Sequence, residues 1–202
     1  KNFLLKTFVK NANFFLRGTN YNLNGLFENW TSTKFKTVKG AWSKLPAKNW
    51  LGHFDLNSGF VGRSPTTPNK KTKYSLKIIG SNENNVFRLA QKIPALGMLR
   101  GFKVGFVRCK FYIFTNSKDI TVQVNIFKKD NQNLNFINIG NIFKSLNDNT
   151  FVKTIDINKW NKMEFETRNL DYFDNSQMFC VTISGFKGCN DYVLINNLNF
   201  NS

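Results

Sequence analysis

Side chains that could carry out catalysis are few in this sequence. His53 is the only histidine, and no G-x-S-x-G nucleophile motif accompanies it. Glu164 and Glu166 share one face of a predicted strand, but alternating glutamates are ordinary on a strand that faces solvent. A glycine-rich phosphate loop is also missing from the sequence. We therefore predict that the protein is not an enzyme.

Aromatic side chains in loop-like segments are the candidates for carbohydrate binding, because exposed rings stack on the apolar faces of sugars. The candidate side chains are Trp42, Trp50, His53, Phe54 and Tyr172. Internal packing is the competing interpretation for the tryptophans, and we expect Trp30 and Trp160 to fill the core.

A cluster of lysines surrounds two of these tryptophans. The chain has 29 Lys and Arg against 12 Asp and Glu, a formal net charge of +17 at pH 7. The densest group is Lys34, Lys36, Lys39, Lys44 and Lys48. Such a group could meet an acidic patch on a neighbouring protein, an anionic glycan or nucleic acid. The other lysines are scattered along the chain, and AT-rich codons favour Lys and Asn, so composition alone explains part of the charge.

The three cysteines are predicted to be free thiols. Cys109, Cys180 and Cys189 cannot all pair within one chain, and the first two lie inside apolar strand patterns, which favours burial. No Cys/His cluster predicts a zinc site. The sequence has neither an apolar run of membrane-spanning length nor a signal-peptide pattern. It begins at Lys1 rather than Met, so we expect it to be a processed part of a longer protein.

The elements that position these side chains are predicted to be strands. Between Ile120 and Ile126 apolar and polar residues alternate, which is the period of a half-buried strand. The run before it, up to Phe114, is apolar on both sides, as in a covered central strand. Thr115 to Asp119 is short and polar. We therefore predict that the two runs form an antiparallel hairpin.

Other strand candidates lie on both sides of this hairpin, and no stretch shows sustained helical periodicity. They are Lys36 to Trp42, Gly59 to Arg63, Lys73 to Gly80, Val86 to Ile93, Thr150 to Ile157, Lys159 to Arg168, Met178 to Gly185 and Asp191 to Phe200. The pattern predicts one sandwich domain over residues 21–202, after a strand or extended arm at residues 1–20. The predicted core contains Phe111, Ile113, Val122, Val124, Phe165, Val181 and Leu194.

The motifs follow one another in an order that resembles a known family. They are NG-x-FE-x-W at 24–30, KYSLKIIG at 73–80, LRGFKVGF at 99–106, W-x-x-x-x-F at 160–165 and YVLINNLNF at 192–200. This order resembles the galactose-binding-like modules that bind carbohydrates, including those found in phage tail fibres and appendages. The resemblance covers nearly the whole chain. It implies an all-β fold, a jelly-roll β-sandwich of two antiparallel sheets.

The resemblance also implies a candidate metal site. In many of these modules a structural calcium is held by the glutamate of the FE motif and an aspartate in the last strand. Glu28 and Asn196 occupy these positions here. An amide oxygen brings no charge, and this weakens a site for a hard cation. We expect no cofactor, with calcium as the one candidate metal and pairing with nearby lysines as the alternative role of Glu28.

These observations lead to an expectation of function. The resemblance, the charge and the lack of catalytic motifs predict a non-enzymatic virion structural or appendage domain of the phage tail type, located in the virion and assembled in the host cytoplasm. Its partners would be neighbouring virion proteins and glycans. The alternatives are a free carbohydrate-binding module, secreted or at the cell surface, and a basic nucleic-acid-binding protein.

Overall fold

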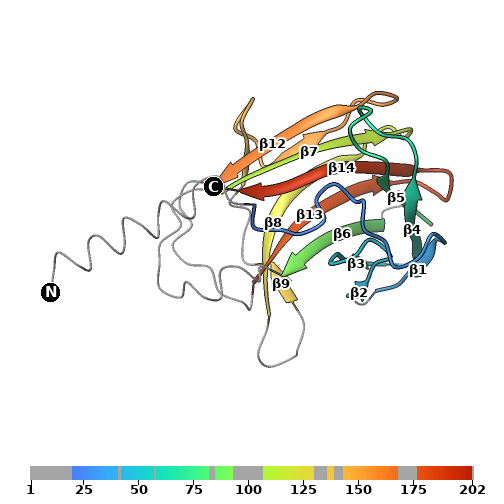
Figure 1. Ribbon diagram of the computed structural model, residues 1–202. Coiled ribbons are helices and arrows are strands. Elements are labelled where there is room, and N and C mark those ends of the chain that lie inside the picture. The colour runs from blue at the N-terminus through green and yellow to red at the C-terminus, as the bar shows by residue number, and fades with distance from the viewer. Residues whose placement is uncertain are drawn as a thin grey trace, which may run out of the picture.

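Two antiparallel β-sheets stack face to face in this chain (Figure 1). The computed structural model describes residues 20–40, 42–56, 58–81, 85–92, 107–129, 136–138, 143–167 and 177–201. Within these ranges the regular elements are all strands, so no described helix could cross a membrane. The predicted fold class, a jelly-roll β-sandwich, is confirmed. Most of the arm predicted at residues 1–20 and the motif at 99–106 lie outside the described residues.

The first sheet has seven strands, and all of its pairings are antiparallel. In spatial order they are β1 (Lys36–Val38), β4 (Gly59–Ser64), β5 (Ser75–Ile79), β14 (Tyr192–Asn201), β7 (Val107–Thr115), β12 (Asn161–Thr167) and β10 (Lys144–Ser145).

The second sheet is also antiparallel, and it faces the first across the core. In spatial order its strands are β11 (Val152–Thr154), β8 (Thr121–Lys129), β13 (Gln177–Phe186), β6 (Asn85–Lys92), β3 (Leu51–Phe54) and β2 (Ser43–Lys44), with β9 (Phe136–Asn138) beside β8.

The core lies between the inner faces of the two sheets. Every second residue of β7 is buried, because side chains of a strand alternate between its two faces. Rings from opposite sheets stack on each other in this layer, with the centroids of Phe179 and Phe200 4.4 Å apart. All seven predicted core residues are buried. Leu194, however, lies on the outer face of β14, since its neighbours Val193 and Ile195 belong to the core.

The predicted hairpin between β7 and β8 is wrong. The two strands belong to different sheets, so the connection through residues 116–120 crosses from one sheet to the other. Alternation specifies which face of a strand is buried, and two strands can bury their apolar faces against each other from opposite sheets as well as side by side. The corner is tight: a Cβ on Gly185, whose φ is +96°, would lie 2.1 Å from the carbonyl oxygen of Asp119.

We expected Trp160 to fill the core, but it lies on the outer side of the first sheet. Its ring lies 5.7 Å from that of Phe114, which projects from the outer face of β7 and stacks on Tyr192 at 6.2 Å. Trp30 is partly buried and packs against the core. Phe114, on the outer face of β7, is thus flanked by two aromatic rings.

The prediction of free thiols is confirmed. Cys109 and Cys180 are buried and unpaired, and Cys189 is exposed and unpaired. Burial raises the pKa of the Cys109 thiol well above its usual value and that of Cys180 to about 12. Both buried thiols therefore stay protonated at neutral pH and act as small apolar side chains.

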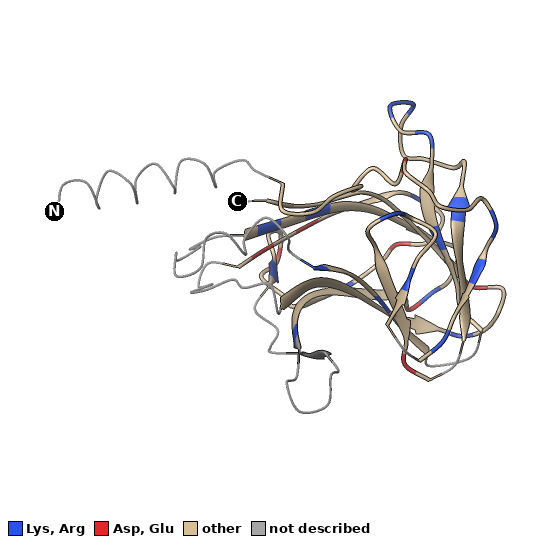
Figure 2. Cartoon of the chain, turned by 60° about the horizontal axis from the view of Figure 1, so that its bottom comes forward, with Lys and Arg blue, Asp and Glu red and all other residues tan. Residues whose placement is uncertain are grey.

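Basic side chains are spread over the whole sandwich. Figure 2 shows Lys and Arg on strands of both layers and on the loops, with few Asp and Glu among them. An excess of one charge acts on solubility and on partners more than on the fold. Where unpaired lysines gather is therefore more informative about a binding partner than the net charge is.

We predict that Val124→Ala destabilises the protein by about 1 to 3 kcal/mol, because the side chain is only 1% exposed and its removal leaves a cavity. Val152→Ala is the matched control: Val152 is 47% exposed, and its loss should cost less than about 0.5 kcal/mol. Urea denaturation measures both values. Equal effects of the two substitutions would contradict the assigned register of β8.

Candidate binding site

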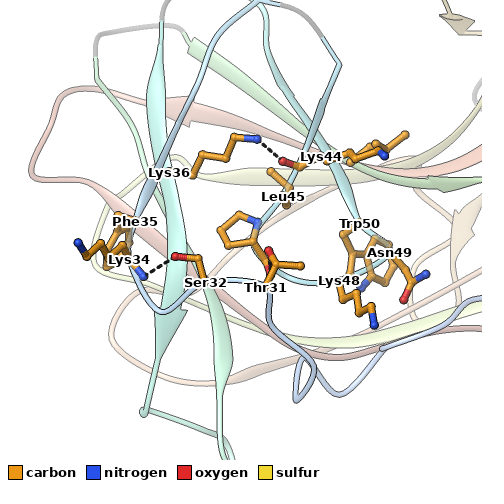
Figure 3. Close-up of a pocket in the computed structure, with 12 residues that line it drawn as sticks. Thr31, Ser32, Lys34, Phe35, Lys36, Lys44, Leu45, Lys48, Asn49 and Trp50 are labelled. Carbon is orange, nitrogen blue, oxygen red and sulfur yellow. Dashed lines mark hydrogen bonds between the residues drawn. The ribbon is translucent and has the colours of Figure 1, made fainter.

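A cavity of about 630 Å³ opens at one edge of the sandwich, where the first sheet ends in β1 and the second in β2 and β3. One wall is residues 31–36, which lead into β1, and the other is residues 44–51, which join β2 to β3. The lining residues are Thr31, Ser32, Lys34, Phe35, Lys36, Lys44, Leu45, Pro46, Lys48, Asn49, Trp50 and Leu51 (Figure 3).

The second wall is a hairpin. Lys44 pairs with Leu51 in the ladder of β2 and β3, and the amide of Leu45 donates to the carbonyl of Trp50 at 3.0 Å. Asn49 closes the turn with φ of 74°, a left-handed conformation that asparagine tolerates better than most residues. The wall is therefore a regular turn with its own hydrogen bonds.

Trp50 anchors the floor of the cavity. Its side chain is only 1% exposed; the indole packs on Phe27 with centroids 5.5 Å apart, and its Nε1 donates to the carbonyl of Asn24 at 3.0 Å. A ring held on several sides supports the site, and only its edge can contact a ligand. Trp50, which the sequence analysis named as a candidate binding residue, thus lines the cavity as part of its floor.

Asn24 ties the hairpin wall to the segment before the first wall. Its Nδ2 donates to the carbonyls of Asn29, at 2.8 Å, and of Lys48, at 2.9 Å, and its Oδ1 accepts from the amide of Asn29 at 3.1 Å. The amide of Thr31 also donates to the carbonyl of Pro46 at 2.8 Å. The two walls are therefore fixed relative to each other before any ligand arrives, which lowers the entropic cost of binding.

Phe35 supplies the exposed aromatic surface of the site. It is 43% exposed and lies against β4 at Gly62, where a Cβ would come within 2.7 Å of the ring. The glycine thus leaves room for the ring to rest on the strand while its other face meets solvent. Sequence reasoning missed Phe35, because its role depends on a glycine in another strand.

Four of the five predicted cluster lysines line the cavity: Lys34, Lys36, Lys44 and Lys48. Lys36 lies between the walls, where its Nζ donates to the carbonyl of Lys44 at 2.5 Å (Figure 3). Lys39 is exposed but does not line the cavity. The structure therefore gathers most of the sequence cluster around one opening.

Trp42 and His53 lie elsewhere, on the outer face of the second sheet. Their rings are 5.2 Å apart, and Trp42 also packs edge-on against Phe127 at 5.8 Å. His53 Nδ1 lies 3.1 Å from a carboxylate oxygen of Asp55, which also pairs with Arg88. Burial, with a smaller contribution from Arg88, lowers the pKa of His53, so the imidazole is neutral at pH 7. Neither ring faces the cavity.

The two remaining predicted sugar-binding residues do not join the site. Phe54 is fully buried and packs on Phe87 in the core, with centroids 4.8 Å apart, so it has no face free for a sugar. Tyr172 lies outside the described residues. The predicted aromatic set therefore does not form one platform.

The acidic residues noted in the sequence are engaged in surface pairs. Glu164 pairs with Lys162 at 2.9 Å, which lowers the pKa of the carboxyl, and Glu166 lies 3.5 Å from Arg108. All four project from the outer face of the first sheet, where β12 pairs with β7. This arrangement matches the solvent-face interpretation of the two glutamates.

Glu28 and Asn196 do not present the features of a calcium site. Asn196 is buried; its Oδ1 accepts from the hydroxyl of Thr72 at 3.2 Å and its Nδ2 donates to the carbonyl of Tyr74 at 2.8 Å. Its oxygen is thus already bonded, whereas Glu28 is exposed. Among the described residues, no three His, Cys, Asp or Glu side chains gather in one place. Because Asn196 is held inside the sandwich by its hydrogen bonds and Glu28 lies on the surface, we expect these two residues not to share a calcium ion.

Comparison with known proteins identifies the fold. No protein-family model matches the sequence, and no curated protein matches it significantly. Similar solved structures include the CBM22-1 xylan-binding domain of Xyn10C from Paenibacillus barcinonensis, 15% identical with a TM-score of 0.52, covering 92% of this chain and 95% of that one. A putative sugar-binding protein from Bacteroides thetaiotaomicron is 14% identical with a TM-score of 0.51, covering 92% and 95%.

One part of a phage protein has a similar fold. The enzymatically active domain of tailspike protein 4 from bacteriophage CBA120 is 13% identical with a TM-score of 0.51, and the match covers 90% of this chain and 21% of that one. The chain therefore has the jelly-roll sandwich fold of carbohydrate-binding modules, which also occurs in a phage tailspike.

We predict that Asn24→Ala lowers the free energy of unfolding by about 2 to 4 kcal/mol, because it removes the hydrogen bonds that join the walls and forces alanine to a φ of 52°. Asn24→Gly loses the same bonds but tolerates the backbone, so it should cost about 1 kcal/mol less. Urea denaturation measures both. Wild-type stability in the two variants would show that Asn24 does not hold the walls together.

We also predict that millimolar calcium leaves the melting temperature of the wild-type protein unchanged, because the Asn196 oxygen is already hydrogen-bonded and ligands raise stability only when they bind the folded state. Differential scanning calorimetry with calcium and with chelator tests this. A rise in melting temperature that Glu28→Ala abolishes would contradict it and assign a metal to Glu28.

Proposed function

We propose that this chain is a non-enzymatic glycan-binding domain whose ligand lies in the cavity between residues 31–36 and 44–51. The observation that carries the proposal is the exposed ring of Phe35 beside a cavity whose walls are already fixed. Its volume of about 630 Å³ falls in the usual range of small-ligand sites, roughly 300 to 1,000 Å³. Aromatic faces and fixed polar groups are what sugar rings require.

The polar lining suits hydroxyl groups. Thr31, Ser32 and Asn49 line the cavity together with apolar Leu45 and Pro46. Hydroxyl and amide side chains both donate and accept hydrogen bonds, so each can donate a hydrogen bond to a sugar hydroxyl or accept one from it. The Paenibacillus domain of the same fold is described as xylan-binding, which supports a binding role for this architecture.

The same lining argues against hydrolysis. Glycoside hydrolysis uses two carboxyl groups that flank the scissile bond, and none of the twelve described residues that line the cavity is Asp, Glu or His. A sugar bound there would meet no carboxyl or imidazole group among these residues. We therefore propose that the domain holds its ligand without changing it.

A second candidate role is that of a virion appendage domain. The similar fold in a phage tailspike and the exposed lysines support it. In this role the cavity lysines would contact acidic residues of a neighbouring virion protein. Assembly would take place in the host cytoplasm. Exchange of these lysines for Glu should then reduce incorporation into particles. Normal incorporation of that variant would exclude this role for the cavity. If the chain is instead a free carbohydrate-binding module, the location that fits it is secreted or at the cell surface.

We predict that Phe35→Ala lowers the affinity for a retained polysaccharide about two- to tenfold, because aromatic stacking is worth roughly 0.5 to 1.5 kcal/mol. Affinity electrophoresis against xylan, galactan and polygalacturonate identifies the ligand, and calorimetry with an oligosaccharide measures the loss.

Phe60→Ala is the matched control for this prediction. Phe60 is also 43% exposed, and it lies on β4 outside the cavity. It should bind like the wild type, and both variants should keep the wild-type melting temperature. Equal affinity in the two variants would remove Phe35 from the site, and no retention by any polysaccharide would overturn glycan binding.

A further inference from the structure

The charge around the cavity is of one sign. Lys34, Lys36, Lys44 and Lys48 line it, and none of its twelve described lining residues is acidic. In the part of the chain that the structure describes, none of these four lysines makes an ion pair. Four ammonium groups with no counter-charge repel one another across the opening, and an anion bound between them relieves this repulsion.

Some lysines elsewhere on the surface are paired with carboxylates, whereas others, such as Lys39 and Lys70, make no ion pair among the described residues. Lys153 pairs with Asp148, Lys159 with Asp156 at 2.8 Å, and Lys187 with Asp119 at 2.7 Å. What distinguishes the cavity is that four lysines with no carboxylate among the lining residues surround one opening. The cavity is therefore the described feature that combines an exposed ring, hydrogen-bonding groups and unpaired cations.

The lysines approach the cavity from both walls. Lys34 and Lys36 come from the first wall and Lys44 and Lys48 from the second. Figure 3 shows Lys34 and Lys48 on opposite sides of the site, with Lys36 reaching across between the walls. The stems of exposed lysines are flexible, so the ammonium groups can close on a ligand from two directions.

We propose that the cavity selects acidic carbohydrate: a glycan whose sugar ring stacks on Phe35 and whose carboxylate or sulfate groups pair with the four lysines. This inference rests on the proposed function and names the class of glycan. Lysine suits both kinds of anion, because its ammonium is a compact charge with three donors and no fixed planar geometry. The apolar floor and the exposed ring bind the sugar, and the lysines discriminate in favour of the acid.

Nucleic acid fits the same cavity less well. Single-stranded nucleic acid is held in an extended basic groove with a succession of aromatic rings on which consecutive bases stack. Here one exposed ring, Phe35, lies in a cavity bounded by two walls. Trp50 is buried and Trp42 lies on the outer face of the second sheet. A short acidic saccharide matches this geometry.

The test uses two ligands with the same sugar backbone, an oligogalacturonate and its fully methyl-esterified form. Calorimetry at about 50 and about 500 mM sodium chloride measures the affinity, because exposed charges are screened beyond about 10 Å at 0.1 M salt. We expect the acid to bind at least tenfold more tightly than the ester at low salt, with most of this difference lost at high salt. A heparin oligosaccharide that binds more tightly than the galacturonate would also support the proposal and assign sulfate as the preferred anion.

Substitution of the cavity lysines tests the residues. The variant with Lys34, Lys36, Lys44 and Lys48 changed to Gln should bind the acid only as tightly as it binds the ester. The control variant changes four exposed lysines that do not line the cavity, Lys39, Lys70, Lys71 and Lys73, to Gln. It has the same net charge and should bind like the wild type.

A fallback variant keeps the test valid if the walls loosen. Lys36 donates a hydrogen bond to the opposite wall, so a variant that retains Lys36 and changes only the other three cavity lysines should keep the wild-type melting temperature and still lose most of the preference for the acid. Equal binding of acid and ester, unaffected by these substitutions, would overturn the preference for acidic glycans and leave the proposed glycan binding intact. If the protein binds neither ligand and no heparin, both the acidic-glycan inference and the proposed glycan-binding function are overturned. Equally tight binding of an oligothymidylate, lost in the same variants, would assign the cavity to nucleic acid.

Discussion

Each sheet of this sandwich must bury one face against the other, and the rest of the structure follows from that constraint. Alternating apolar residues in β7 and β8 satisfy it from opposite sheets, so the short connection between them passes across the core edge. The outermost strands β1 and β2 then end their sheets at the same edge of the molecule, with β1 close to β3. The cavity lies in the loops that extend from these strands.

A small number of hydrogen bonds from side chains to backbone carbonyls converts this edge into a site. The side chain of Asn24 bonds to carbonyls on both Asn29 and Lys48, and the Trp50 indole donates to the Asn24 carbonyl. An edge strand has a hydrogen-bonded neighbour on one side only. On the open side these bonds join the two walls and fix the spacing between them. Because the cavity is formed in advance, little of the binding free energy is lost in ordering its walls. The lysines around it, which have no carboxylate partner in the cavity, favour a negatively charged ligand.

The sequence predicted strands and core well because burial alternates along a strand, and Val122 and Val124 lie where that pattern places them. The strands that pair with β7 and with β8 were not predictable, since alternation carries no information about the partner strand. Within the site, the lysines were found because they are close in sequence. Phe35 was not, because its exposed face depends on Gly62 in another strand. Trp50 and Phe54 show that a ring in a loop-like segment has the same sequence signature whether it is core or surface.

The central claim is that a glycan binds between the two walls at the sandwich edge. A titration of the ¹⁵N-labelled protein with oligogalacturonate, followed by the shifts of backbone amide resonances, tests it most directly. The account predicts saturable shifts concentrated in residues 31–36 and 44–51, the two walls of the cavity. Shifts concentrated around Trp42, His53 and Arg88 on the outer face of the second sheet, with the walls unaffected, would contradict it.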